Sequence, residues 1–235
     1  MRRAHGTGTL FAVSMLLGGC AVATMTPETR TRMVDADAAK LANVPACCRD
    51  WRDVDYTRVL GSEGTDVDFG PDSQVRDVEG GRAPVVGFRI PEPARAETIQ
   101  VFSFSDARHG AFRFDDRLFV RPDLVFLDRQ FATLESATDI PMCYGGLDRS
   151  GGVWYRHAIP AHAAYVVLSP STHVPMQAVD TRILGTIPPG IQMIADARGK
   201  TYLSAVAMGY TGLVSVRAVA ASAPPLGRCV EASPN

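Results

Sequence analysis

The sequence predicts a mainly β protein: an antiparallel, jelly-roll-like β-sandwich with one or two short helices. Two observations lead to this prediction. Beyond Trp51 the chain is made of short runs rich in β-branched and aromatic residues, which are typical of strands. Glycine, proline and aspartate separate these runs at spacings of roughly 8 to 12 residues, as turns do in a sandwich. Roughly ten such strands fit in one domain of ordinary size.

The first element after position 20 is a polar segment, residues 20–45, that is short of large apolar residues. Within it, "DADAAKLA" at residues 35–42 predicts a short helix. We interpret residues 20–45 as a tether that leads into the sandwich domain, residues 46–220. A partner-binding arm is the alternative, and no residue pattern favours it.

The clearest strand prediction is "FRFDDRLFV", residues 112–120, because apolar and charged residues alternate in it. Phe112, Phe114, Leu118 and Val120 would share one face of this strand. Shorter apolar or alternating runs predict further strands at residues 83–91, 98–104, 122–127, 151–157, 163–168 and 212–219.

One helix is predicted in the second half of the chain. Residues 175–184, "PMQAVDTRIL", begin with proline and are followed by Gly185, which suits the two ends of a helix. The last segment, residues 221–235, contains several prolines and small residues, and we interpret it as a loose C-terminal tail.

The N-terminus predicts an export signal, residues 1–19. Arg2 and Arg3 precede an apolar run at residues 9–17, and two glycines follow it. This run is shorter than the roughly 20 residues that span a bilayer. The signal ends in "LLGGC", which resembles a bacterial lipobox, so we expect cleavage before Cys20 and attachment of lipid to its thiol. An ordinary signal peptide with an incidental cysteine is the alternative.

Lipid on Cys20 would make the protein a lipoprotein held to a membrane by acyl chains such as palmitate. Ala21 follows this cysteine instead of aspartate, which indicates the outer membrane of a double-membraned bacterium, with the domain in the periplasm. No later apolar run approaches membrane-spanning length. The net charge of the chain is −1 at pH 7, and loss of Arg2 and Arg3 makes it more acidic, so we expect no nucleic-acid partner.

The sequence contains no complete catalytic motif of the kinds considered next. "GKT" at residues 199–201 lacks the upstream glycine of a phosphate-binding loop, and no G-x-S-x-G turn occurs. Asp66 and Asp68 would share a strand face, as in any half-exposed strand. His157 and His162 are five residues apart and would need further ligands to bind zinc. We therefore expect no enzyme, no cofactor and no metal site.

Aromatic residues are the remaining candidates for a binding site. "GGVWYRH" places Trp154, Tyr155 and Arg156 together on a presumed strand. Flat rings can stack on sugars while arginine binds hydroxyl groups. Because neighbouring strand residues face opposite sides, we expect one of the two rings to pack in the core.

The order of features from Cys47 onward resembles the maltose operon periplasmic protein family. The resemblance rests on four stretches: "CCRDWRDVDYTRVL", "GRAPVVGFRIPE", "LFVRPDLVFLD" and "AYVVL". Where the family has leucine before a proline, Ile90 precedes Pro91. The resemblance spans most of the chain after the signal and implies an exported or lipid-anchored accessory protein associated with maltose and maltodextrin uptake. It carries over no catalytic or ligand-binding residue.

The cysteines predict disulfides, because a periplasmic protein folds in an oxidising compartment. With Cys20 lipidated, Cys47, Cys48, Cys143 and Cys229 remain, which allows three complete pairings. A Cys47–Cys48 bond is disfavoured, since adjacent α-carbons lie only about 3.8 Å apart and disulfides usually span at least about 4.4 Å. We expect one or both to pair at long range, first with Cys143 and then with Cys229.

These observations together predict a non-enzymatic, lipid-anchored periplasmic accessory protein. Its binding role would be in carbohydrate uptake of the maltose or maltodextrin type, or in binding envelope glycans. The alternative is a structural or interaction protein of a cell-envelope complex that has no small ligand.

Overall fold

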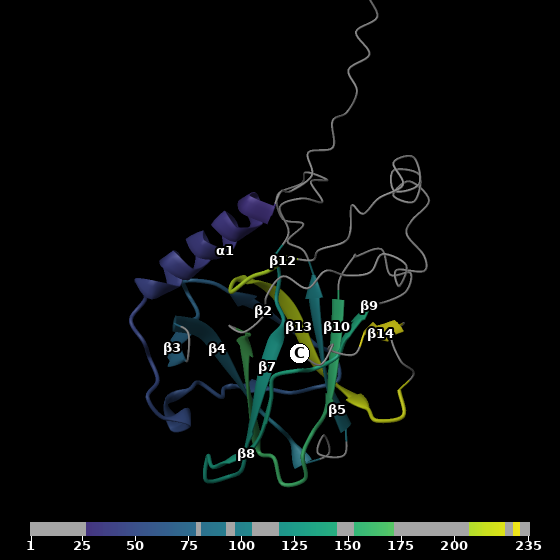
Figure 1. The fold of residues 1–235 in the computed structure, drawn as a ribbon. Helices are drawn as coiled ribbons and strands as arrows, with labels where there is room; N and C mark the ends of the chain where they lie inside the picture. The colour runs from purple at the N-terminus through teal and green to yellow at the C-terminus, as the bar shows by residue number, and fades with distance from the viewer. Residues whose placement is uncertain are drawn as a thin grey trace, which may run out of the picture.

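The computed structural model describes residues 27–78, 81–92, 97–104, 118–144, 153–171, 207–223 and 228–230. In these residues the chain forms two six-stranded sheets that enclose a common core, together with an α-helix outside them (Figure 1). The prediction of a mainly β sandwich is therefore confirmed.

The first sheet has the strand order β1-β4-β11-β7-β8, and β3 also pairs with β4. Its strands are β1 (Arg58–Val59), β3 (Gln74–Val78), β4 (Gly81–Arg89), β7 (Pro122–Leu127), β8 (Thr133–Ala137) and β11 (Tyr165–Pro170). The second sheet has the order β14-β9-β10-β5-β13-β2. Its strands are β2 (Thr65–Phe69), β5 (Glu97–Phe104), β9 (Met142–Tyr144), β10 (Val153–Ala158), β13 (Gly212–Ala220) and β14 (Arg228–Val230).

Among the strands that the structure describes, two pairs are parallel, so the expectation of wholly antiparallel sheets is wrong at these places. β1 runs parallel to β4, and the short strands β6 (Leu118–Phe119) and β12 (Ala207–Met208) also form a parallel pair. Parallel neighbours need a long connection. β2 and β3 lie between β1 and β4 in the chain and supply it.

The core lies between the sheets and is built by alternation along each strand. In β13 every second residue is buried, including Val214 and Val216, while the residues between them are partly exposed. Phe88 of β4 and Phe126 of β7 meet these side chains from the first sheet. The side-chain period of two therefore predicts which residues of these strands are buried.

The first sheet is covered on its outer face as well. β4 has six consecutive buried residues, 83–88, which a strand with one exposed face cannot have. Its outward residue Val85 packs with Leu127, Val167 and two residues of the preceding segment, Cys48 and Val54. Residues 47–57 thus form a lid of chain over this sheet.

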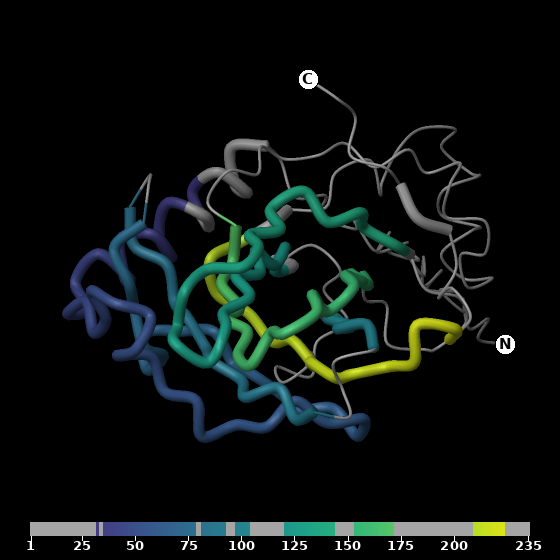
Figure 2. Tube along the Cα trace, turned by 90° about the horizontal axis from the view of Figure 1, so that it is seen from below, coloured from purple at the N-terminus to yellow at the C-terminus, as the bar shows by residue number. Residues whose placement is uncertain are grey.

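The helix α1 (Pro27–Ala42) begins earlier than the expected 35–42. It lies outside the sheets, beside the end of the sandwich that holds β2, β3 and β4 (Figure 1). Seen from below in Figure 2, the purple and blue N-terminal part of the chain follows the outside of the sandwich. Asp37 and Leu41 are one helical turn apart and both are buried. The second half of α1 is therefore docked on the domain.

Several predictions lie outside the described residues and stay predictions. These are the signal with Cys20, the helix at 175–184 and most of the strand at 112–120, of which only the last three residues are described. The boundaries proposed for the tether and the C-terminal tail are also untested.

Candidate functional site

The outer face of the second sheet gathers the residues that the sequence singled out for binding. Tyr155 points into the core, where it is fully buried, whereas Trp154 and Arg156 are partly exposed on the opposite side of β10. The prediction that one of the two rings packs in the core is correct. The candidate surface therefore contains Trp154 and Arg156 without Tyr155.

Trp154 lies against Phe102 of the neighbouring strand β5. The two residues are opposite each other in the antiparallel register, and their rings stack with centroids 3.9 Å apart and planes inclined by 30°. Aromatic cross-strand pairs of this kind stabilise a sheet. Here the pair also fixes the orientation of the indole ring.

A polar row lies next to this aromatic pair. Arg156 and Arg217 flank Gln100, each opposite it in register, on the three neighbouring strands β10, β5 and β13. Arg156 donates from Nε and Nη2 to Gln100 Oε1 at 3.3 and 3.1 Å, and from Nη1 to the Ala223 carbonyl oxygen at 3.1 Å. Burial, and then the charge of Arg217, lower the pKa of the Arg156 guanidinium.

Two donors in this row have no acceptor. Gln100 is fully buried, and its Nε2 makes no hydrogen bond. Arg217 Nε is also buried without a partner, while the Arg217 guanidinium carbon lies 5.7 Å from the centre of the Trp154 ring. Each buried, unpaired donor costs about 1 to 3 kcal/mol. Such groups in a native fold call for an explanation, and a ligand is one.

Gln100, Phe102 and Arg217 were not singled out from the sequence. One signal was available: Gln100 stands between the apolar residues Ile99 and Val101 in "TIQVFSF". An isolated glutamine in such a run indicates a polar feature within a sheet. Which strands flank it could not be read from the sequence, because β5 pairs with β10 and β13, both far away in the chain.

A second distinctive feature is a disulfide between the adjacent residues Cys47 and Cys48, whose α-carbons lie 3.7 Å apart. The expectation that these cysteines pair at long range is therefore wrong. The argument from the usual α-carbon spacing excluded a bond that the backbone of this segment accommodates. Cys143 is also disulfide-bonded, and Cys229 lies opposite it in the register of β9 and β14.

The two cysteines of this bond have different surroundings. Cys47 is exposed, and its backbone N–H donates to the carbonyl oxygen of Val75 on β3 at 2.7 Å. Cys48 is 3% exposed and belongs to the apolar cluster under the lid. The disulfide thus lies within the lid, at the point where the Cys47 backbone is hydrogen-bonded to β3.

Aromatic side chains continue this cluster. Trp51 opens a short 3-10 helix, η1 (Trp51–Asp53), and the Arg76 guanidinium lies 3.5 Å from the centre of its ring. Tyr56 Oη donates to the Trp51 carbonyl oxygen at 2.8 Å. The ring of Tyr56 lies 4.7 Å from that of Tyr165, which stacks on Phe131 at 4.6 Å.

Burial and, second, the nearby Tyr165 raise the pKa of the Tyr56 phenol well above its usual value, so Tyr56 keeps its proton. The phenol can then donate its hydrogen bond to Trp51 at any ordinary pH. Gly87 lies directly beneath, and a Cβ at this position would meet the Asp55 carbonyl oxygen and the Tyr56 ring at 2.6 Å each. The lid therefore requires glycine at position 87.

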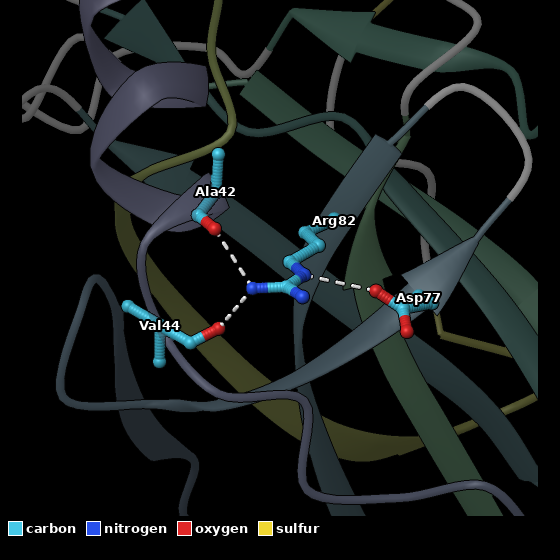
Figure 3. Close-up of polar contacts among 4 residues, drawn as sticks. All are labelled: Ala42, Val44, Asp77 and Arg82. Atoms are coloured by element: carbon cyan, nitrogen blue, oxygen red, sulfur yellow. Dashed lines mark hydrogen bonds and ion pairs between the residues drawn. The ribbon is translucent and has the colours of Figure 1, made fainter.

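An arginine on β4 binds the end of α1 (Figure 3). Arg82 donates from Nη1 to the carbonyl oxygens of Ala42 at 2.8 Å and Val44 at 2.6 Å, and from Nε to Asp77 Oδ1 at 2.9 Å. The last carbonyl groups of a helix lack partners within the helix, and a cation there is favourable. We call this arrangement the Arg82 clamp. Asp37, on the same helix, accepts a hydrogen bond from Thr211 Oγ1.

The remaining candidates do not form a site among the described residues. Asp66 and Asp68 share the exposed side of β2, as expected for a half-exposed strand. His157 on β10 forms a hydrogen bond with Glu135 on β8 of the first sheet, with Nε2 and Oε1 2.6 Å apart. His162 lies exposed in a turn. No group of three His, Cys, Asp or Glu residues in the described segments could hold a metal ion. Within the same segments, no helix is long and apolar enough to cross a membrane.

The fold places the chain in the broad class of β-sandwich proteins. Comparisons with protein-family models, with curated proteins and with solved structures found no match.

Proposed function

We propose that this chain is a lipid-anchored, non-enzymatic accessory protein of the periplasm, which binds carbohydrate on the outer face of its second sheet. The ligand would be a maltodextrin-type sugar or an envelope glycan. The observation that carries the proposal is the fixed Trp154 ring, stacked on Phe102 and bordered by the polar row of Arg156, Gln100 and Arg217. An aromatic plane beside several hydrogen-bond donors suits a sugar ring, which has apolar faces and polar edges.

Two further points support the proposal. The lipobox "LLGGC" predicts attachment at Cys20, which would place the domain at the periplasmic side of the outer membrane. The resemblance to the maltose operon periplasmic protein family implies an accessory role in sugar uptake.

Fluorescence provides a direct test of sugar binding, because the chain has only two tryptophans. Trp51→Phe leaves Trp154 as the single reporter. Maltodextrins and cell-wall glycan fragments are then titrated into this variant, and we expect a saturable change in Trp154 emission. Calorimetry on the otherwise unchanged chain should give the same affinity, and Trp154→Ala should weaken it at least tenfold.

A matched control is Trp51→Ala, which removes the other tryptophan, in the lid over the first sheet, and should leave the affinity unchanged. If no glycan binds, or if Trp154→Ala leaves every affinity unchanged, sugar binding on this face is wrong. Crosslinking in cells that then captures one defined envelope protein would favour the alternative of a structural or interaction protein.

The anchor is tested separately. We expect the unchanged chain to incorporate a labelled fatty acid and to fractionate with the outer membrane, whereas Cys20→Ser should do neither. Equal labelling of both forms would remove Cys20 as the lipid site.

A further inference from the structure

We infer that the ligand of the outer face is acidic: the geometry points to a glycan carrying a carboxylate, held by Arg217 and Gln100 beside the Trp154 ring. This inference rests on the proposed function and names the chemical class of its ligand.

Arg217 is the first reason. Its guanidinium contacts the Trp154 ring, yet among the described residues no carboxylate pairs with it. Its Nε is buried without an acceptor. Arginine presents its donors as a planar fork that matches the two oxygens of a carboxylate. The cation therefore lies at the aromatic plane with part of its donor set unused.

Gln100 is the second and independent reason. Its oxygen is already occupied by two donors of Arg156, which orients the amide and leaves Nε2 as the unused end. The side chain is fully buried, so this nitrogen lacks bulk water as well as a protein acceptor. A buried amide nitrogen next to a guanidinium can share one acceptor group with it, since the two residues face each other across β5 and β13.

The charge of the row argues against a neutral ligand. Hydroxyl groups of a neutral sugar would accept hydrogen bonds but would leave the repulsion between Arg156 and Arg217 unchanged. A carboxylate supplies acceptor oxygens and one negative charge together, and charge-assisted hydrogen bonds are stronger than neutral ones. Trp154 would at the same time hold the ring that carries the carboxylate.

The test compares glycans of equal length and different charge. Maltohexaose is neutral and hexagalacturonate carries carboxylates, and both are titrated into the full-length chain and the Trp51→Phe variant. We expect hexagalacturonate to bind at least tenfold more tightly, and its affinity to fall with added salt as an ion pair is screened. Arg217→Gln should reduce this preference about tenfold, while Arg217→Lys should retain part of it.

Arg129→Gln is the matched control, because Arg129 is an exposed arginine paired with Glu92 outside this face. It should leave both affinities unchanged. Thermal unfolding of each variant shows whether it is folded. A further variant, Gln100→Glu, places a carboxylate beside Arg217. It should abolish the preference for the acidic glycan without unfolding the chain.

The possible failures are distinguishable. If the neutral and acidic glycans bind equally and Arg217→Gln changes neither, the carboxylate assignment is wrong while sugar binding stands. A preference for a phosphorylated oligosaccharide over hexagalacturonate also overturns the carboxylate assignment. If neither kind of glycan binds, the proposed function fails and this inference fails with it.

Discussion

At Gly87 the lid lies so close to the first sheet that there is no room for a side chain. Replacing it by alanine places a methyl group 2.6 Å from the Asp55 carbonyl oxygen and from the Tyr56 ring, and the backbone atom cannot move aside cheaply. We expect Gly87→Ala to lower the free energy of unfolding by about 1 to 3 kcal/mol, as overpacking does. Urea unfolding monitored by circular dichroism measures this.

Gly61→Ala is the control for that experiment, because nothing lies within 4 Å of a Cβ at position 61. Its effect should stay within about 0.5 kcal/mol, as for ordinary surface substitutions. Equal losses in the two variants would contradict the close approach of the lid.

The phenol of Tyr56 predicts a dependence of stability on alkaline pH. Its pKa is raised by burial in the folded chain, whereas in the unfolded chain it ionises near pH 10. Above that pH the folded state holds a proton that the unfolded state has lost, so stability falls as pH rises. The slope should be up to about 1 kcal/mol per pH unit, after allowance for solvent around a half-buried group.

The comparison of Tyr56→Phe with the unchanged chain isolates this contribution. At pH 7 the variant should be less stable by about 1 kcal/mol, because it loses the hydrogen bond to the Trp51 carbonyl oxygen. Urea unfolding at several pH values between 8 and 11 should show that the free energy of unfolding falls less steeply with pH in the variant than in the unchanged chain. Identical slopes would show that Tyr56 titrates normally.

At the scale of secondary-structure elements, the Arg82 clamp decides whether α1 stays docked. Arg82→Gln removes the charge that binds the Ala42 and Val44 carbonyl oxygens, so we expect amide hydrogens of residues 35–44 to exchange at least tenfold faster. Hydrogen exchange with mass spectrometry measures this, and exchange in β13 should not change. Arg52→Gln, which loses one exposed hydrogen bond, is the control.

The two kinds of disulfide should differ in their effect on stability. A bond between neighbours closes almost no loop, so the chain-entropy model gives the Cys47–Cys48 bond only about 1 kcal/mol. A bond from Cys143 to Cys229, its neighbour in register, would close a loop of roughly 90 residues and contribute about 4 to 5 kcal/mol. Cys143→Ser should therefore destabilise the chain more than the double change Cys47→Ser, Cys48→Ser.

Peptide mapping without reduction checks the connectivity first. The tryptic peptide of residues 41–49 contains both adjacent cysteines and should be lighter by two hydrogen atoms than its reduced form. A peptide containing Cys143 should be found joined to one containing Cys229. Recovery of the 41–49 peptide joined to another peptide would overturn the assignment of the vicinal bond.

At the scale of the whole molecule, the sandwich could be predicted because alternation is a local signal. "PDLVFL" became β7 with the expected bounds, and the apolar run "TIQVFSF" became β5. The parallel pairing of β1 with β4 could not be predicted, since it depends on strands far apart in the chain. The lid over the first sheet could not be predicted either, because Cys48 and Val54 pack on strands that are far away in the chain.

The candidate site was only half predictable. Trp154 and Arg156 are two residues apart in the sequence, and the strand period predicted correctly that one of the two neighbouring rings, Trp154 or Tyr155, is buried, but not which one. Gln100 and Arg217 join them only through cross-strand register, which no local pattern specifies. The prediction that Cys47 and Cys48 pair at long range was wrong for a different reason: their α-carbons lie 3.7 Å apart, closer than in most disulfides, and the bond forms nevertheless.

The Arg82 clamp finally has a mechanical consequence. A pull on the chain from its N-terminal side travels along α1 and reaches the domain at the hydrogen bond between Asp37 and Thr211 and then at Arg82, before it reaches the first strand, β1. Arg82 lies on β4, which is paired with β1, β3 and β11. Arg82 lies opposite Asp77 of β3, whereas β1 and β11 pair with residues 86–89 of β4, so force that enters at the clamp acts first on the ladder between β3 and β4. If the protein hangs from a membrane by its N-terminus, tension on the tether becomes, at the clamp, load on the ladder between β3 and β4.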